Sequence, residues 1–154
     1  MPHYGEFVRE VLRKQGFEKE MESLPYPYEE PLGFILLAKI GKEFAGAVAM
    51  RPLPKKFSMK ARTNSESEMR VCEMKRMYVS ERFRGLGIGK LLAQSCVKEA
   101  ALCGYDMMVL DTRDDSIFAP ARSIYEKVGF QKREPYYEND DDGMLFYELD
   151  LHNK

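Results

Sequence analysis

The segment from Val71 to Gly104, VCEMKRMYVSERFRGLGIGKLLAQSCVKEAALCG, dominates the structural interpretation of this sequence. Its first part, Val71 to Val79, is rich in β-branched, aromatic and sulfur-containing side chains, which is typical of a half-buried strand. From Ile88 onward apolar residues recur at helical spacing, and Gly104 provides a helix stop. We therefore predict a strand, a glycine-rich turn and a helix in direct succession.

The turn, Arg84-Gly85-Leu86-Gly87-Ile88-Gly89, has glycine at every second position. This spacing disfavours a helix interior or a central strand, because glycine loses the most conformational freedom when it is ordered. A glycine-rich turn at a helix N-terminus exposes backbone N–H groups, which can bind phosphate. The alternative interpretation is that the glycines serve only the architecture of the turn.

Three common glycine-rich patterns do not fit. A Walker loop requires Ser or Thr after GxxxxGK, whereas Gly89 and Lys90 are followed by Leu91. The dinucleotide fingerprint has the spacing GxGxxG in the first strand–helix unit of a doubly wound sheet, whereas this chain has GxGxG in mid-chain. The protein-kinase loop joins two strands and belongs to a catalytic set that a chain of 154 residues is too short to hold.

The pattern that fits is Arg-x-x-Gly-x-Gly after a strand that ends Met77-Tyr78-Val79, and here the chain resembles the GNAT superfamily of N-acetyltransferases. In that family the turn and the helix N-terminus hold the pyrophosphate of acetyl-CoA, and the preceding strand end pairs its backbone with the pantetheine arm. The resemblance therefore implies that acetyl-CoA is the cosubstrate. It also implies that these residues bind it: Met77, Tyr78, Val79, Arg84, Gly85, Leu86, Gly87, Ile88, Gly89 and Lys90.

A second segment, Ala121 to Phe130 (ARSIYEKVGF), resembles the second signature of the same family, in which a helix with a Tyr is followed by Gly-Phe. Two signatures in the right order are more specific than either one alone. The resemblance extends from Phe34 to Leu151. It departs from the family pattern at Phe118, where many members have an Asn that contacts the cofactor, and in the long loop 52–69.

Further strands are expected at 34–40 and 44–51, joined by a Gly41-Lys42 hairpin turn, and at 105–112 and 143–151. The strand at 105–112 follows a helix that follows a strand, so it should lie parallel to 71–79. With the resemblance, the predicted fold is α/β. It is a mixed, mostly antiparallel twisted sheet of about six to seven strands, flanked by about four helices, with a central parallel βαβ unit. Residues 1–154 are expected to form a single N-acetyltransferase domain.

Composition and charge exclude several other classes of protein. The net charge of −1 gives no field that would attract nucleic acid or an anionic membrane. No apolar segment approaches membrane-spanning length, and the first residues lack the apolar core of a signal peptide. Cys72, Cys96 and Cys103 are an odd number of cysteines in a predicted strand and helix, so we expect reduced thiols in a cytoplasmic protein. His3 and His152 lie at the chain ends, and no metal site is expected.

The resemblance also implies a catalytic set. Tyr125 matches the family tyrosine near the cofactor sulfur, and a phenol with a pKa of about 10 can protonate a thiolate; the alternative is a tyrosine that only packs under the sheet. The amide of Met77 would stabilise the oxyanion. Glu73 has the spacing of the glutamate base in the histone-acetylating branch. Alternatively, Glu73 forms a structural ion pair with Lys75 or Arg76, and an ordered water acts as the base.

The predicted function is an acetyl-CoA-dependent N-acetyltransferase that acts on a primary amine, either a small molecule or a peptide lysine. Direct transfer in a ternary complex is expected, because terminal histidines cannot form a Cys-His pair. The alternative is a non-catalytic GNAT-like coenzyme A-binding sensor or interaction module. The loops Tyr26–Glu30 and Tyr136–Asp142 are rich in tyrosine and acid, which favours a cationic acceptor. A homodimer is one option for the assembly, and fold alone cannot choose the substrate.

Overall fold

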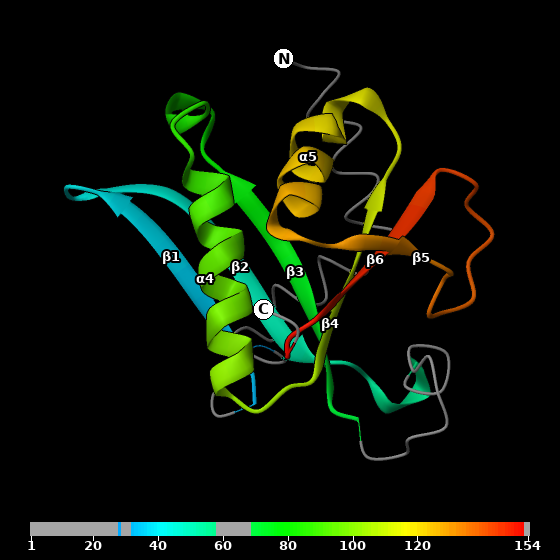
Figure 1. The fold of residues 1–154 in the computed structure, drawn as a ribbon. Helices are drawn as coiled ribbons and strands as arrows, with labels where there is room; N and C mark the ends of the chain where they lie inside the picture. Colours follow the sequence, from blue (N-terminus) through cyan, green and yellow to red (C-terminus); the bar gives the residue numbers. More distant parts are fainter. Residues whose placement is uncertain (1–27, 29–31, 58–68, 153–154) are drawn as a thin grey trace.

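The computed structural model describes Tyr28 and residues 32–57 and 69–152. Within these ranges Figure 1 shows one twisted sheet with strand order β1-β2-β3-β4-β6-β5. The helices and strands are β1 (Phe34–Ile40), β2 (Glu43–Pro52), β3 (Val71–Val79), α4 (Ile88–Leu102), β4 (Met107–Arg113), α5 (Ala119–Val128), β5 (Gln131–Arg133) and β6 (Met144–Asp150). Short 3₁₀ turns occupy Lys55–Phe57, Glu81–Phe83 and Ser116–Phe118.

The predicted fold class is confirmed. β3 and β4 are parallel and are connected through α4, whereas the other four strand pairings are antiparallel. The described ranges contain six strands and two α-helices. The apolar spacing also predicts two helices near Phe7–Leu12 and Phe17–Leu24, and both segments lie outside the described residues. No helix in the described ranges has the length and apolar character needed to cross a lipid bilayer.

The hairpin between β1 and β2 turns at Gly41, whose φ of 62° is a conformation that glycine adopts without steric cost. The next pairing, between β2 and β3, contains a β-bulge. Ala47 pairs with Tyr78 and Ala49 pairs with Lys75, so Val48 of β2 faces two residues of β3. One of the two, Arg76, has a φ of 57°. The bulge bends β3 shortly before the glycine turn.

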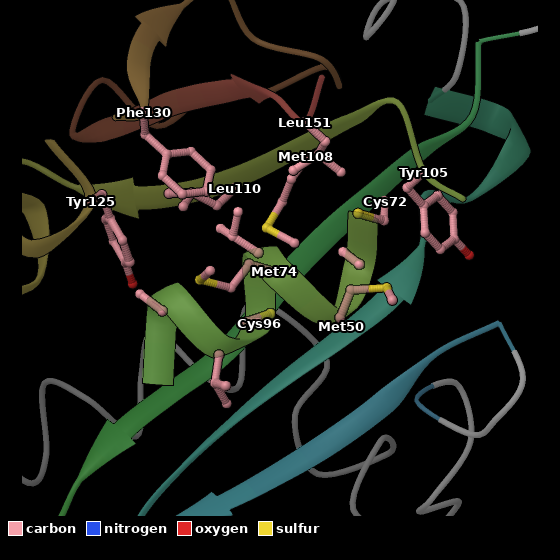
Figure 2. Close-up of a cluster of buried hydrophobic side chains, with 14 of the residues drawn as sticks. Met50, Cys72, Met74, Cys96, Tyr105, Met108, Leu110, Tyr125, Phe130 and Leu151 are labelled. Carbon is pink, nitrogen blue, oxygen red and sulfur yellow. The ribbon is translucent and has the colours of Figure 1, made fainter. Parts of the chain in front are cut away.

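Two apolar clusters lie on the two faces of the sheet. The helix-side core gathers side chains from the sheet, α4 and α5, and it is rich in sulfur; Figure 2 shows Met50, Cys72, Met74, Cys96 and Met108 within it. The opposite-face cluster consists of Leu53, Val71, Met107, Val109, Tyr136 and Phe146. Residues of β3 and β4 alternate between the two clusters, as the two-residue period of a strand requires.

Candidate active site

β3 and β4 separate along their length. Their parallel pairing is limited to Val71–Glu73 against Met107–Val109. From Met74 to Val79 the edge of β3 that faces β4 therefore has no strand partner among the described residues. Figure 1 shows the two strands diverging toward the end of the sheet where α4 begins and α5 lies. An unpaired strand edge can bind an extended ligand through its backbone.

The glycine turn lies at this open end and presents bare backbone. Gly85 and Gly87 have φ of 81° and 85°, and a Cβ added to either would have no neighbour within 4 Å. The first intrahelical bond of α4 runs from the Leu91 amide to the Gly87 carbonyl, at 3.1 Å. The amides from Gly85 to Lys90 have no acceptor among the described residues. Together with the helix dipole, such amides could hold an anion.

The third glycine and the arginine of the turn have structural roles. A Cβ on Gly89 would lie 2.7 Å from Ile124 Cδ1, so this glycine allows α4 to approach α5. The Arg84 Nε donates a hydrogen bond to the Val79 carbonyl at 3.0 Å, which ties the turn to the end of β3. Leu86 and Lys90 are exposed beside the turn.

The end of β3 carries the predicted pantetheine contacts. The β-bulge lies where the family resemblance implies one, directly before Met77. Met77 and Val79 pack against the helix-side core, whereas Tyr78 is 51% exposed. Gly46 of β2 lies so close to this strand that an added Cβ would be 2.5 Å from the Tyr78 carbonyl oxygen. The close approach of β2 fixes the position of the end of β3. This end borders the region where β3 and β4 are no longer paired, which we call the opening.

Tyr125 lies on α5 at one end of the helix-side core. Its side chain is buried, and its ring packs against Phe130 and Tyr147 with centroid distances of 6.0 and 6.3 Å. In Figure 2 its hydroxyl points away from Phe130. No described residue forms a hydrogen bond with this hydroxyl. Burial raises the pKa of Tyr125 above its usual value, and the negative charge of Asp111 adds to the shift. The Tyr125 hydroxyl therefore keeps its proton at neutral pH.

Glu73 is 1% exposed on the opposite face of β3. Its Oε1 accepts hydrogen bonds from Arg51 Nε at 2.8 Å and Nη2 at 2.7 Å, and its Oε2 accepts one from the Tyr136 hydroxyl at 2.5 Å. Arg51 on β2 thus supplies the pairing cation, whereas Lys75 pairs with Asp111. Both carboxylate oxygens thus accept hydrogen bonds from described residues. The function of Glu73 as a base stays a prediction.

Asp111 is a buried polar residue near the site that the sequence does not single out, and it pairs with Tyr137. Asp111 lies on β4, and its Oδ2 accepts a hydrogen bond from the Tyr137 hydroxyl at 2.5 Å. Its Oδ1 faces Lys75 Nζ at 3.9 Å. The available signal was a carboxylate directly after the apolar run Met107–Leu110, because a buried charge is costly unless it is paired or used. The polar network of the opposite face consists of Lys75, Asp111 and Tyr137 together with Arg51, Glu73 and Tyr136.

The two predicted catalytic side chains lie on different faces of the sheet. Tyr125 belongs to the helix-side core, and Glu73 points toward the opposite-face cluster. β3 and β4 stop pairing after Glu73 and Val109, so no strand pairing joins them beyond these residues. A reacting group between the two strand ends would have the Tyr125 hydroxyl on one side and a charged network on the other.

The acidic loop after β5 is partly structural. Asp141 forms an ion pair with Arg113 and accepts a hydrogen bond from the Gly143 amide at 3.0 Å. An open pocket lies against the loop and is lined by Pro135, Tyr137, Glu138, Asn139 and Asp140. Of the other acceptor-side loop, Tyr26–Glu30, the structure describes only Tyr28, which is buried. In the described part of the chain no three His, Cys, Asp or Glu side chains are grouped to hold a metal.

Known proteins match this chain in sequence. The model of the acetyltransferase (GNAT) family matches residues 5–130. An uncharacterized N-acetyltransferase of Schizosaccharomyces pombe is 32% identical over 138 residues, which cover 89% of this chain and 76% of the relative. The match therefore includes both signature segments and most of the relative.

Solved structures match the fold. A GNAT-family acetyltransferase from Staphylococcus aureus has a TM-score of 0.66 and 20% identity, and the match covers 95% of this chain and 89% of the other. A GNAT-family acetyltransferase from Elizabethkingia anophelis, with acetyl-CoA bound, has a TM-score of 0.57 and 23% identity, with coverage of 77% and 76%. At these identities the similarity concerns the fold.

Proposed function

Because the chain belongs to the acetyltransferase (GNAT) family and is therefore an acyltransferase, we propose that it is an acetyl-CoA-dependent N-acetyltransferase. It transfers the acetyl group to a primary amine, of a small molecule or a peptide lysine, directly within a ternary complex. The observation that carries this proposal is the opening between β3 and β4 beside a turn with unoccupied amides.

The residues around the opening fit acetyl-CoA. The amides of Gly85–Lys90 would hold the pyrophosphate, since the space next to Gly85 and Gly87 is open. The unpaired edge of β3 at Met77–Val79 would pair with the pantetheine arm. Phe118, at the N-terminus of α5, offers no amide side chain, so the Asn contact of many family members is absent. The structural neighbour from Elizabethkingia anophelis holds the same cosubstrate.

Acetyl transfer forms a C–N bond and breaks a C–S bond, and acetyl-CoA supplies the activated acetyl group. Tyr125 would donate its proton to the departing sulfur, and the proton released by the amine would restore the balance. The amide of Met77 would donate a hydrogen bond to the oxyanion. Tyr125 is protonated at neutral pH, as a proton donor must be, and its hydroxyl has no hydrogen-bond partner among the described residues, which supports this role.

The base is either Glu73 or an ordered water. The hydrogen bonds from Arg51 and Tyr136 occupy both oxygens of the carboxylate, so direct proton uptake by Glu73 would require one bond to break. This geometry supports the structural role of Glu73 and an ordered water as the base. The variant Arg51→Met and the double variant Arg51→Met/Glu73→Gln distinguish the two and are described in the Discussion.

The cofactor assignment can be tested by thermal unfolding of the full chain with acetyl-CoA, coenzyme A, ATP or NAD. A ligand at about one hundred times its Kd stabilises the folded state by about 2.7 kcal/mol. We expect Tm to rise with acetyl-CoA and coenzyme A only, and an amine screen by thiol release would then follow. An unchanged Tm with both would contradict the assignment.

A further inference from the structure

A buried ion pair spans the opening on the face opposite the helices. The last residues paired in the parallel register are Glu73 and Val109. Lys75 and Asp111 lie two residues beyond them on the same face, so they face each other across the opening. Lys75 Nζ is 3.9 Å from Asp111 Oδ1, and each side chain is 8% exposed. The pair therefore lies next to the point where β3 and β4 stop pairing, and Lys75 is two residues before Met77.

This pair is too widely spaced for a hydrogen bond. Charge-assisted N–H···O bonds have lengths of about 2.7–2.9 Å. Asp111 is the group that pairs with Lys75 in the described part of the chain, so the ammonium keeps N–H donors without an acceptor there. A buried charge without a close partner is costly, and such groups are concentrated at functional sites.

Neighbouring groups do not satisfy Lys75. The carboxylate of Glu73 accepts hydrogen bonds from Arg51 and Tyr136 with both of its oxygens. The Oδ2 of Asp111 is occupied by Tyr137, which leaves Oδ1 directed toward Lys75. The opening thus presents one under-coordinated ammonium next to one under-coordinated carboxylate oxygen.

We propose that Lys75 and Asp111 bind the carboxylate and the amine of the acceptor, and that the acceptor is an amino acid with a carboxylate next to its amine. Such a zwitterion has the complementary charge pattern: its carboxylate accepts from Lys75 and its ammonium donates to Asp111 Oδ1. The inference rests on the proposed function and names the acceptor class. It replaces the cationic acceptor expected from the acidic loop, where Asp141 is paired with Arg113.

The acceptor class can be tested with matched compounds that differ only in the carboxylate. Thiol release from acetyl-CoA is measured with alanine, leucine, phenylalanine and lysine, and with ethylamine, isoamylamine, 2-phenylethylamine and cadaverine. For at least one pair we expect the KM of the amino acid to be lower by about tenfold or more, as loss of a charged hydrogen bond predicts. A preference for the decarboxylated amine in every pair would overturn the inference.

Variants of Lys75 test the residue itself. Lys75→Met keeps the apolar stem but removes the charge, and it should raise the KM of the preferred amino acid about tenfold while leaving that of the matching amine unchanged. Lys75→Arg should restore part of the difference. Lys39→Met, on the exposed part of β1, is the matched control and should change neither value. An equal loss with both acceptors would show that the ion pair is only structural.

Binding without turnover separates this inference from the proposed function. Calorimetry on the wild-type chain with coenzyme A present compares each amino acid with its matching amine. If acetyl-CoA raises Tm but no amino acid binds more tightly than its amine, the inference is wrong and the proposed function stands. If acetyl-CoA does not raise Tm, the proposed function is wrong, and the same calorimetry without coenzyme A still decides whether Lys75 and Asp111 bind a zwitterion.

Discussion

The two faces of the sheet differ in whether the polar groups next to the opening have hydrogen-bond or ion-pair partners. On the helix side, Tyr125 lies in a core of apolar and sulfur-containing side chains, and its hydroxyl has no partner among the described residues. On the opposite face, Glu73 and Asp111 are buried within a network of cations and tyrosines. A neutral hydroxyl thus lies on one side, while charges are held in fixed positions on the other. In the proposed mechanism, this difference separates the acid, Tyr125, from the groups proposed to bind the acceptor.

The largest effect is expected from breaking the network at Arg51. Arg51→Met leaves the buried carboxylate of Glu73 without its cation, and removal of one partner of a buried pair costs about 3–5 kcal/mol. We expect the free energy of unfolding in urea to fall by this amount. The double variant Arg51→Met/Glu73→Gln should recover much of the loss, because neither charge remains.

The same double variant decides the role of Glu73. If Glu73 is structural, turnover should return together with stability. Recovery of stability without recovery of turnover would instead identify the carboxylate as the base.

The helix side is tested by Tyr125→Phe. Loss of the acid should lower kcat about 100-fold, with the affinity for acetyl-CoA unchanged. Stability should change little, because the hydroxyl makes no hydrogen bond with a described residue. Steady-state kinetics and thermal unfolding measure the two effects. Tyr147→Phe, in the same aromatic cluster, is the control and should keep its turnover. Wild-type turnover in Tyr125→Phe would remove this residue as the acid.

The corresponding change on the opposite face, Tyr136→Phe, should mainly lower stability, whereas Tyr125→Phe should mainly lower turnover. Tyr136→Phe removes the hydrogen bond to Glu73 Oε2, and an unsatisfied buried acceptor costs about 1–3 kcal/mol. We expect a lower free energy of unfolding, measured in urea, and a smaller loss of turnover than in Tyr125→Phe. If Tyr136→Phe is as stable as the wild type, the network is not as rigid as its hydrogen bonds indicate.

The smallest effect is expected at an exposed pair that belongs to neither face. His152 Nε2 lies 2.5 Å from Asp106 Oδ1; the hydrogen bond raises the pKa of His152 and lowers that of Asp106. The stabilisation from His152 is therefore present below its unfolded pKa of about 6.5 and is lost as the pH rises through the folded value. The stabilisation from Asp106 is lost at low pH.

The two pKa shifts together predict that the His152–Asp106 pair stabilises the folded state fully between about pH 4 and pH 6.5. In thermal unfolding, His152→Asn should lower Tm by less than about 2 °C at pH 5.5, because the pair is exposed to solvent. At pH 8.5 the variant should match the wild type. A larger difference at pH 8.5 than at pH 5.5 would contradict the assigned linkage.

The sequence predicts the helix-side architecture well, because that part depends on local patterns. The glycine spacing and the apolar period place the start of α4 at Ile88, where the structure has it. α5 begins at Ala119 rather than Ala121, because Pro120 is tolerated in the first turn of a helix. The parallel βαβ unit follows from the order of the elements and is confirmed.

The opposite face could not be predicted in the same way, because its contacts depend on strand register. Arg51 and Glu73 are 22 residues apart, and Tyr136 lies 63 residues from Glu73. A β-bulge shifts the register of β2 against β3, and no local pattern in the sequence determines that shift. The apolar strand that contains Asp111 likewise does not indicate the partner of its carboxylate.

The bulge at Arg76 has a consequence for the side chains that follow it. In a regular strand, residues three apart point to opposite faces, yet Met74 and Met77 both pack against the helix-side core. The extra residue gives β3 two reading frames, one before the bulge and one after it. A regular strand of the same length, without the bulge, would instead turn Arg76 and Tyr78 toward the helices and Met77 away from them. By absorbing one residue, the bulge thus determines which side chains at the end of β3 face the helices.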